Sequence, residues 1–314
     1  MCSMLDEVRR FAAVRRGFRF LWILGLLRGM AIFAGPDATV SVCATTGMVA
    51  DLARGVGGDA VAVHALMGPG VDPHLYKATA SDLVRLQRAD LILYNGLHLE
   101  GRMQETFERL ARSGRRVRAV TEGLARERLI RTGAEGLHDP HVWFDVRLWA
   151  DCTDGVAREL SGLRPESTEG FRTRAAAVKD RLAELDRWAR GRVVAVPASR
   201  RILVTSHDAF AYFCRAYGLR SAAPTGWSTG EEIGGGATPE RRRETVASIR
   251  RFGVKAIFVE TSVNPKAVRA IAADAGVRIG GELYSDSMGP PGSAGETYLG
   301  MMRENIVTIV ESLR

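Results

Sequence analysis

The chain has 314 residues, of which 46% are hydrophobic and 25% charged, proportions typical of a soluble globular protein long enough for two domains. Its formal charge of +8 does not indicate a nucleic-acid partner. Residues 1–34 hold six arginines and two acidic residues, a net +4, which leaves only +4 for the rest of the chain. Because no basic helix or arginine–aromatic alternation stands out, we expect no contact with nucleic acid.

The first 36 residues are organised like an export signal. A basic region precedes the apolar run FLWILGLL, and small residues close the segment at Ala34. The run is too short for a transmembrane helix, and Arg28 interrupts it. We therefore expect residues 1–36 to be a signal peptide of an exported protein, periplasmic after cleavage or held at the cell surface if uncleaved. A later start, at Met4 or beyond, would leave the export prediction unchanged.

Four cysteines occur, at Cys2, Cys43, Cys152 and Cys214, without a Cys-x-x-Cys pair. Their unrelated spacings disfavour a thiolate metal site and thioredoxin-type redox chemistry. Cys43 lies in the apolar strand pattern VSVCATT, which is a poor lipoprotein cleavage site, so we expect it to be buried.

From residue 39, strand patterns alternate with helical patterns. Strands are expected at residues 39–46, 60–67, 90–96 and 116–122, and helices at 47–56, 81–89 and 103–113. This alternation predicts a parallel sheet with helices on both faces. Residues 123–138 lack a clean period and are expected to form a loop.

Residues 165–194 carry a long amphipathic stripe. Its members recur every three or four residues: Phe171, Ala175, Val178, Leu182 and Leu185. One helix of this length would span about 45 Å, so we interpret it as a single helix joining two lobes. A break into two shorter helices near Arg190-Gly191 is the alternative.

Beyond this helix the alternation restarts, with strands expected at 200–207, 255–261 and 277–286 and helices at 208–218, 238–253, 264–276 and 294–313. The fold is thus expected to be α/β, with two lobes that are each a mostly parallel sheet flanked by helices. We divide the chain into the signal peptide (1–36), an N-terminal lobe (37–164), the linking helix (165–196) and a C-terminal lobe (197–314).

The tripeptide Asp-Pro-His occurs twice, at Asp72–His74 and at Asp139–His141. In each copy, proline fixes the backbone before the imidazole and keeps the preceding residue out of a helix, so each histidine is expected on a rigid loop. Two such histidines predict one metal ion held between distant parts of the chain, and a chance repeat is the alternative. The two aspartates could each orient the neighbouring imidazole or form a local turn.

Two further candidate ligands follow predicted strands. His207 ends the pattern ILVTSH, and Asp286 lies in the loop of GGELYSDSMG. Ligands collect beyond the carboxyl ends of strands in open α/β sheets, and three imidazoles with one carboxylate make a complete ligand set for a divalent transition ion. Asp208 is expected to cap the helix that follows. The remaining histidines are interpreted as packing or surface residues: His64, His98 and His138.

Several long strings run in order from residue 40 to the C-terminus: MGPGVDPHLYKATASDLVRLQRADLILYNGLHLE, DPHVWFDVRLW, ILVTSHDAFAYFCRAYG, AIFVETS, GGELYSDSMG and ETYLGMMRENI. They resemble the solute-binding proteins of zinc and manganese ABC importers, most closely the TroA-like group. The resemblance implies two α/β lobes bridged by one helix, with metal ligands at His74, His141, His207 and Asp286. It also implies that the partner is an integral-membrane permease with its cytoplasmic ATPase, and we expect the protein to be a monomer.

The sequence departs from this pattern in two places. The segment TGWSTGEEIGGGATPE is unusually rich in glycine, and the histidine-rich acidic insertion of many dedicated zinc carriers is missing from the sequence. Manganese-dedicated relatives tend to have a carboxylate where His207 stands, whereas three imidazoles and one aspartate suit zinc better than manganese. We therefore expect non-enzymatic capture and delivery of Zn²⁺, with Mn²⁺ as the alternative cargo. A zinc-dependent hydrolase and a surface adhesin are the alternative functions.

Overall fold

The first lobe is built on a four-stranded sheet. The structure, a computed structural model, describes residues 39–132, 136–221 and 239–314, so the predicted signal peptide and nearly all of the glycine-rich segment lie outside the described residues. The strands are β1 (Val40–Ala44), β2 (Val61–Ala65), β3 (Leu91–Tyr94) and β4 (Val117–Ala119). They are arranged in the order β2-β1-β3-β4, and every pair is parallel, as predicted.

Side chains alternate between the two faces of this sheet, and each face has its own core. One core includes the β1 and β3 residues Val42, Ala44, Leu91 and Leu93 together with helix α1 (Gly47–Gly57). The other includes Cys43 and Ile92 together with helices α2 (Ala80–Arg88) and α3 (Gln104–Arg112). Helices therefore cover both faces, and Cys43 is buried as expected.

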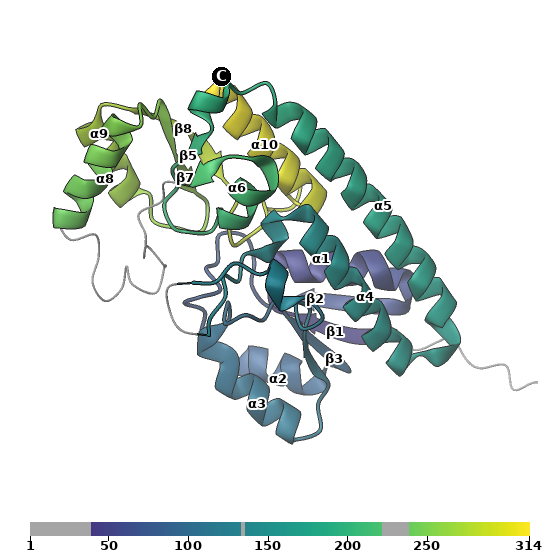
Figure 1. Cartoon of the computed structure of the whole chain (residues 1–314). Helices are drawn as coiled ribbons and strands as arrows, with labels where there is room; N and C mark the ends of the chain where they lie inside the picture. Colours follow the sequence, from purple (N-terminus) through teal and green to yellow (C-terminus); the bar gives the residue numbers. More distant parts are fainter. Residues whose placement is uncertain (1–38, 133–135, 222–238) are drawn as a thin grey trace, which may run out of the picture. The chain divides into compact units, whose positions relative to one another are not determined.

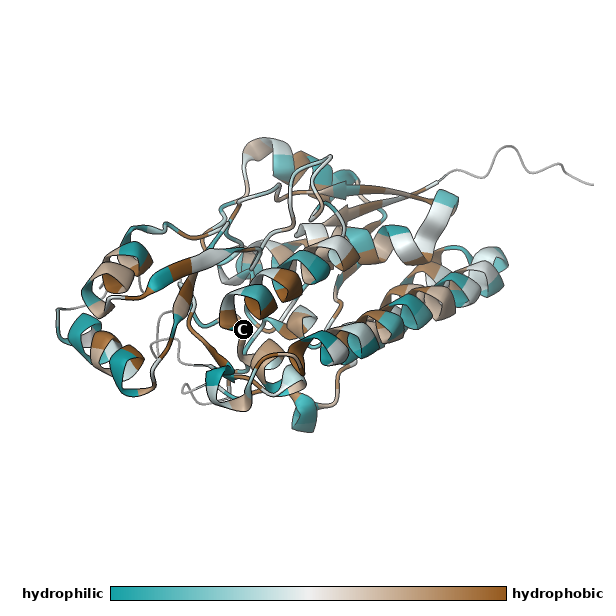
Figure 2. Cartoon of the chain, turned by 90° about the horizontal axis from the view of Figure 1, so that it is seen from above, coloured by the Kyte–Doolittle hydropathy of each residue, from teal (hydrophilic) through white to brown (hydrophobic). Residues whose placement is uncertain are grey.

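Two long helices follow the first sheet. Helix α5 (Thr168–Val193) has 26 residues, spans about 39 Å and continues unbroken through Gly191, so the prediction of one continuous helix is confirmed. Its predicted stripe is buried, and the hydropathy colouring shows polar and apolar residues alternating along it (Figure 2). The helix contacts α1 in the first lobe and, in the second, α6 (Ala211–Tyr217) and α10 (Tyr298–Leu313). It thus joins the lobes along one side (Figure 1).

The second long helix, α4 (Val146–Leu163), packs along α5 and did not emerge from the sequence patterns. It begins immediately after Asp145, whose carboxylate accepts hydrogen bonds from the backbone N–H groups of Arg147 and Leu148, the expected chemistry of a helix N-cap. Eight of its residues are buried. These residues lie on one face and most recur every three or four positions, so the helical period is present in the sequence.

The second lobe contains shorter strands. Parallel pairs are formed by β5 (Ile202–Leu203) with β6 (Arg220–Ser221) and by β7 (Ala256–Glu260) with β8 (Arg278–Leu283). The N–H of Phe258 donates to the carbonyl of Val204, which joins the two pairs. Helices α8 (Pro239–Arg251) and α9 (Lys266–Ala275) lie beside them. The predicted cap at Asp208 is wrong, because α6 starts three residues later and its N-cap is Phe210.

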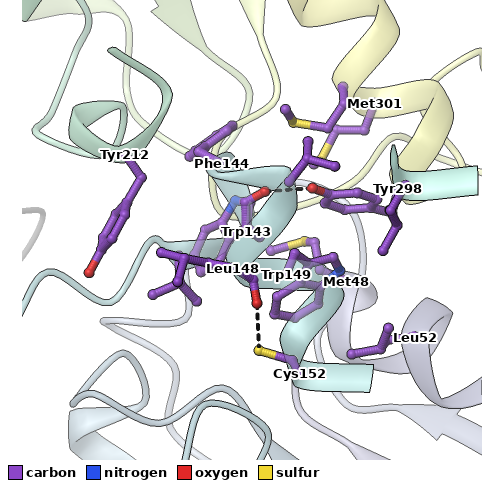
Figure 3. Close-up of a cluster of buried hydrophobic side chains, with 14 of the residues drawn as sticks. Met48, Leu52, Trp143, Phe144, Leu148, Trp149, Cys152, Tyr212, Tyr298 and Met301 are labelled. Atoms are coloured by element: carbon purple, nitrogen blue, oxygen red, sulfur yellow. Dashed lines mark hydrogen bonds between the residues drawn. The ribbon is translucent and has the colours of Figure 1, made fainter. Parts of the chain in front are cut away.

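Aromatic side chains join the two lobes through a shared core (Figure 3). The hydroxyl of Tyr298, on α10, donates to the carbonyl of Trp143 at 2.6 Å. The ring of Tyr298 also stacks on that of Trp149 in α4, with centroids 5.9 Å apart. Trp143 is fully buried and lies two residues after the second Asp-Pro-His. This core therefore fixes one predicted ligand loop against the opposite lobe.

Three cysteines fall in the described part of the chain, and all are free and buried: Cys43, Cys152 and Cys214. Burial raises the pKa of Cys43 and of Cys214 to about 12, so both thiols stay protonated. Among the described residues, no helix is both long enough and apolar enough to cross a bilayer.

Candidate metal centre

Four side chains from four distant segments converge on one point. They are the predicted ligands His74, His141, His207 and Asp286, and one ligand atom of each lies within 4.8 Å of those of the others. The structure thus brings together two histidines of the first lobe with one histidine and one aspartate of the second. His207 and Asp286 are each about 1% exposed and His141 is 5% exposed, whereas His74 is partly buried.

Three of the distances between these donor atoms are close to the edges of a tetrahedron around a small cation. The Nε2 atoms of His74 and His141 are 3.2 Å apart. Asp286 Oδ1 lies 3.4 Å from His141 Nε2, and Asp286 Oδ2 lies 3.2 Å from His207 Nε2. Four donors at the usual zinc–ligand distance of about 2.0–2.1 Å define tetrahedral edges of about 3.3–3.4 Å. The geometry therefore fits a zinc-sized divalent ion.

Three side chains hold the loop that carries His141 in place. Asp139 Oδ1 accepts a hydrogen bond from the backbone N–H of His141 and lies 2.7 Å from its ring Nδ1. The carbonyl of Asp139 accepts from the hydroxyl of Tyr212 on α6, and the carbonyl of Pro140 accepts from the side-chain amide of Asn95. The loop is thus fixed by the first sheet, by α6 and by its own aspartate, with Nε2 of the imidazole facing the other donors.

A glutamate that the sequence patterns did not single out lies against His207. Glu260, the last residue of β7, accepts a hydrogen bond from the backbone N–H of His207, and its second carboxylate oxygen lies 2.6 Å from the ring Nδ1. Both side chains are buried. An acidic partner on one ring nitrogen fixes the tautomer and turns the other nitrogen toward the ligand. The sequence contained one signal for Glu260: it is an acidic residue at the end of the otherwise apolar strand AIFVE.

Two hydrogen bonds tie the loop of Asp286 to the first lobe. The indole N–H of Trp143 donates to the carbonyl of Ser285 at 3.1 Å, and the hydroxyl of Ser287 accepts from the backbone N–H of Gly70 at 2.9 Å. Gly70 lies in the loop that carries His74, where Asp72 Oδ1 accepts from the backbone N–H of His74 at 2.8 Å. The loops of His74 and Asp286 are therefore connected directly.

In the absence of an ion, the donor atoms of the cluster face one another. His207 Nε2 lies against Asp286 Oδ2, and His141 Nε2 lies against Asp286 Oδ1. A bound cation would replace these contacts between side chains with bonds to the metal.

The three histidines of the cluster differ in pKa, because carboxylates lie closer to two of them than to the third. Burial lowers the pKa of His74 to about 3, because the charge of Asp286 does not compensate for desolvation. Burial also disfavours a charged His141, but Asp139 and Asp286 outweigh it and raise its pKa to about 9. At His207, Glu260 and Asp286 likewise overcome burial and raise the pKa well above its usual value. Without a metal, protons on these two imidazoles supply the positive charge.

The other three histidines lie away from this cluster. His64 is exposed on β2, opposite Cys43 in the sheet register. His98 and His138 border a separate cavity of about 510 Å³ on the first lobe. His98 and the adjacent Leu97 both have positive φ, at 65° and 55°, a conformation that is uncommon outside glycine. None of the three belongs to the described four-residue group, which agrees with their interpretation as bystanders.

Comparison with known proteins identifies the family. Residues 42–312 match the family model described as ZnuA, zinc-uptake complex component A, periplasmic. The chain is 44% identical over 301 residues to the zinc-binding protein TroA of Treponema pallidum, covering 92% of this chain and 96% of that protein. It is 41% identical over 283 residues to the manganese-binding lipoprotein MntA of Bacillus subtilis, covering 88% and 91%.

A solved structure shares the fold as well as the sequence. The periplasmic zinc binding protein TroA from Treponema pallidum superposes with a TM-score of 0.82 at 42% identity, covering 88% of this chain and 99% of that one. The family match includes all four convergent side chains and both lobes with their linking helix. The chain therefore belongs to the family described as ZnuA, zinc-uptake complex component A.

Proposed function

We propose that this protein captures a divalent transition-metal ion outside the cytoplasm and delivers it to an integral-membrane ABC permease driven by a cytoplasmic ATPase. The ligands are His74, His141, His207 and Asp286. The observation that carries the proposal is the convergence of these four side chains, from separate segments of both lobes, at distances that fit one ion. Family membership supports the transport role.

The chemistry of the donors favours zinc over manganese. Three neutral imidazoles and one carboxylate leave a divalent site at net +1, and nitrogen-rich sites bind zinc more tightly than manganese. The relatives include both a zinc-binding and a manganese-binding protein, so kinship is compatible with either ion. We infer tighter zinc binding from the donor set itself, with manganese as the alternative cargo in the cell.

Capture follows from the division of the ligands between the lobes. An ion bound at once by His141 and by Asp286 ties the N-terminal lobe (37–164) to the C-terminal lobe (197–314). The unbroken helix α5 and the Trp143–Tyr298 contact limit the accompanying motion to small tilts and loop adjustments. The permease would recognise the tightened, loaded form of a monomer whose signal peptide directs it out of the cytoplasm.

The same geometry argues against a hydrolase. A catalytic zinc ion keeps one position open for water, whereas four protein side chains converge here and can fill the coordination shell. Glu260, the buried acid nearest His207, accepts from the backbone of that residue and lies against its ring, so it is engaged in positioning an imidazole. These contacts support a carrier that encloses its ion.

Substitution of one ligand in the second lobe tests the proposal. His207→Ala is expected to reduce zinc affinity by more than about 100-fold, beyond the usual effect of losing an orienting residue. The matched control is His64→Ala, which removes an exposed imidazole from β2 and is expected to leave affinity unchanged. Competition titration against a chromophoric chelator measures both variants. Retained affinity in His207→Ala would remove this residue from the ligand set.

The metal preference needs a separate measurement. Calorimetric competition between zinc and manganese on the unmodified chain is expected to give the tighter binding for zinc. Manganese bound as tightly as zinc would contradict the preference while leaving the transport role intact.

A further inference from the structure

Glu100 is a buried acid outside the proposed ligand set. It ends the segment NGLHLE that follows β3, and it is 2% exposed. Its carboxylate accepts hydrogen bonds from the hydroxyl of Thr45 at 2.7 Å and from the backbone N–H groups of Asn95 at 2.7 Å and Gly96 at 3.2 Å. Burial raises the pKa of Glu100, against the effect of these donors. A buried acid is costly unless it is hydrogen-bonded, so this position depends on the groups around it.

The turn that leads to Glu100 has an unusual backbone. Gly96, Leu97 and His98 have φ angles of 92°, 55° and 65°, and positive values are uncommon for residues other than glycine. Such conformations persist only where the surrounding structure enforces them. The hydrogen bonds from the N–H groups of Asn95 and Gly96 to Glu100 fix the start of this turn.

The turn places the side chain of Asn95 against the loop of His141. Its Nδ2 donates to the carbonyl of Pro140 at 3.0 Å, and Asn95 is 1% exposed. The backbone carbonyl of Asn95 accepts a hydrogen bond from the hydroxyl of Thr121 at 2.6 Å. Because its backbone N–H is bonded to Glu100 as well, Asn95 is held on both sides of its Cα atom. Its side-chain amide therefore has a fixed position.

The same carboxylate reaches the base of the other Asp-Pro-His loop. Thr45 directly follows β1, and its hydroxyl donates to Glu100. The backbone carbonyl of Thr45 accepts from the N–H of Met67 at 2.9 Å, where the chain has left β2 for the loop that carries His74. Glu100 therefore connects the base of one histidine loop to the base of the other.

The two connected loops carry the imidazoles of the first lobe. Their Nε2 atoms are 3.2 Å apart, close to the tetrahedral edge of about 3.3–3.4 Å around a zinc-sized ion. We propose that Glu100 is a positioning residue that fixes the two loop bases relative to each other and so holds His74 and His141 at this separation. Donors that are held in place before binding lose less freedom when the ion arrives, which increases affinity. This inference rests on the proposed function, because it concerns how two of the proposed ligands are held.

Interrupting the connection at two points tests this role. Glu100→Gln keeps the size of the side chain but replaces one acceptor oxygen with an amide that donates, and Asn95→Ala removes the group that bonds Pro140. In each variant, zinc affinity is expected to fall about tenfold, the lower end of the usual effect of residues that orient ligands. Chelator competition measures the affinity. The visible absorption of bound cobalt(II), which depends on the arrangement of its ligands, is expected to shift in both variants.

A pair of substitutions at Thr45 separates the hydroxyl from the bulk of the side chain. Thr45→Val removes the donor to Glu100 at similar volume, so zinc affinity is expected to fall by up to about tenfold. Thr45→Ser keeps the hydroxyl and is expected to match the unmodified protein in zinc affinity and in its cobalt spectrum. Valine and serine variants that are alike in both measurements would overturn the role of Glu100.

A core substitution in the same lobe controls for a general loss of stability. Leu110, on α3, is buried in the core on one face of the first sheet. Leu110→Ala is expected to lower the urea concentration at which the metal-free chain unfolds, while the folded chain keeps its zinc affinity and cobalt spectrum. Glu100→Gln and Asn95→Ala variants that bind zinc as tightly as Leu110→Ala would contradict the inference. If Glu100→Gln does not fold, Asn95→Ala and the two Thr45 variants decide in the same way.

These outcomes are distinct from failure of the proposed function. An unmodified chain that binds neither zinc nor cobalt would contradict metal capture altogether. An unmodified chain that binds both, together with unchanged affinity and cobalt spectra in Glu100→Gln and Asn95→Ala, would contradict only the role of Glu100.

Discussion

The two Asp-Pro-His loops share a tripeptide, but their surroundings differ. His141 is 5% exposed, its ring Nδ1 lies 2.7 Å from Asp139, and its loop is bonded by Tyr212 and Asn95. His74 is partly buried, and its loop is tied to the second lobe through Gly70 and Ser287. The same three residues thus produce one deeply fixed donor and one more accessible donor.

The difference between the loops extends to charge. Carboxylates raise the pKa of His141 to about 9, whereas burial lowers that of His74 to about 3. At neutral pH the metal-free site therefore contains a cationic His141 and a neutral His74. The comparison teaches that a repeated motif specifies the backbone and the donor atom, while the neighbours determine its protonation and rigidity.

The largest expected effect comes from replacing each histidine in turn. His141→Ala and His74→Ala are both expected to abolish tight zinc binding, but only His141→Ala should destabilise the metal-free chain strongly. It leaves the buried carboxylate of Asp139 without its cationic partner, at a cost of about 3 kcal/mol. His74→Ala removes a neutral, partly buried group, at a cost of about 1 kcal/mol. Urea unfolding in the presence of a chelator measures both, and equal destabilisation would contradict the distinction.

Replacing the two aspartates sharpens the same comparison. Asp139→Asn keeps the size of the side chain but weakens its hold on the His141 ring, so zinc affinity is expected to fall about 10–100-fold. Asp72→Asn alters an acceptor of the backbone N–H of His74, and we expect a fall of less than about tenfold. Chelator competition at constant pH measures the two variants together. Equal losses would mean that the two aspartates have the same role.

A gradual effect is expected in the dependence of affinity on pH. Zinc must displace the proton of His141, whose pKa is raised to about 9, so apparent affinity should rise by about tenfold per pH unit for that proton well below pH 9 and level off above it. Stability of the metal-free chain should change in the opposite direction. Because the pKa of His141 is higher in the folded chain than its ordinary value of about 6.5, the protonated imidazole stabilises the folded chain fully below pH 6.5. This contribution is lost as the pH rises toward 9.

Calorimetry in buffers of different ionisation enthalpy counts the protons that zinc releases. At neutral pH, we expect the unmodified protein to release protons when it binds zinc. The His141→Ala variant, titrated with zinc or cobalt at high metal concentration, is expected to release fewer protons. Binding without proton release in the unmodified protein would show that His141 is already neutral.

Much of the fold and the proposed ligand set could be predicted from local patterns. Strand–helix alternation predicted the parallel sheets, and proline and strand-end positions singled out the four convergent side chains. The contacts around them could not be predicted in this way, because Glu260 lies 53 residues from His207 and Trp143 lies 142 residues from Ser285. Such partners are determined by how the lobes pack, which leaves little trace in local sequence.

Two local errors differ in kind. Helix α4 was not predicted, although its eight buried residues lie on one face and give it the contrast between a polar and an apolar face that is typical of such a helix. Asp208 has the composition of a helix cap, but the chain makes a further turn after His207 and α6 begins only at Ala211. Composition identified a cap-forming residue type without fixing where the helix starts.

The buried cysteines have a consequence for how the protein behaves in an oxidising compartment. Thiolates are strong zinc ligands and are also the form of cysteine that oxidants attack. Cys43, Cys152 and Cys214 are buried, and desolvation holds each thiol in its protonated, unreactive form. The convergent donors are all nitrogen or oxygen atoms. Within the described chain, the capacity to hold an ion is therefore independent of the thiol redox state of its surroundings.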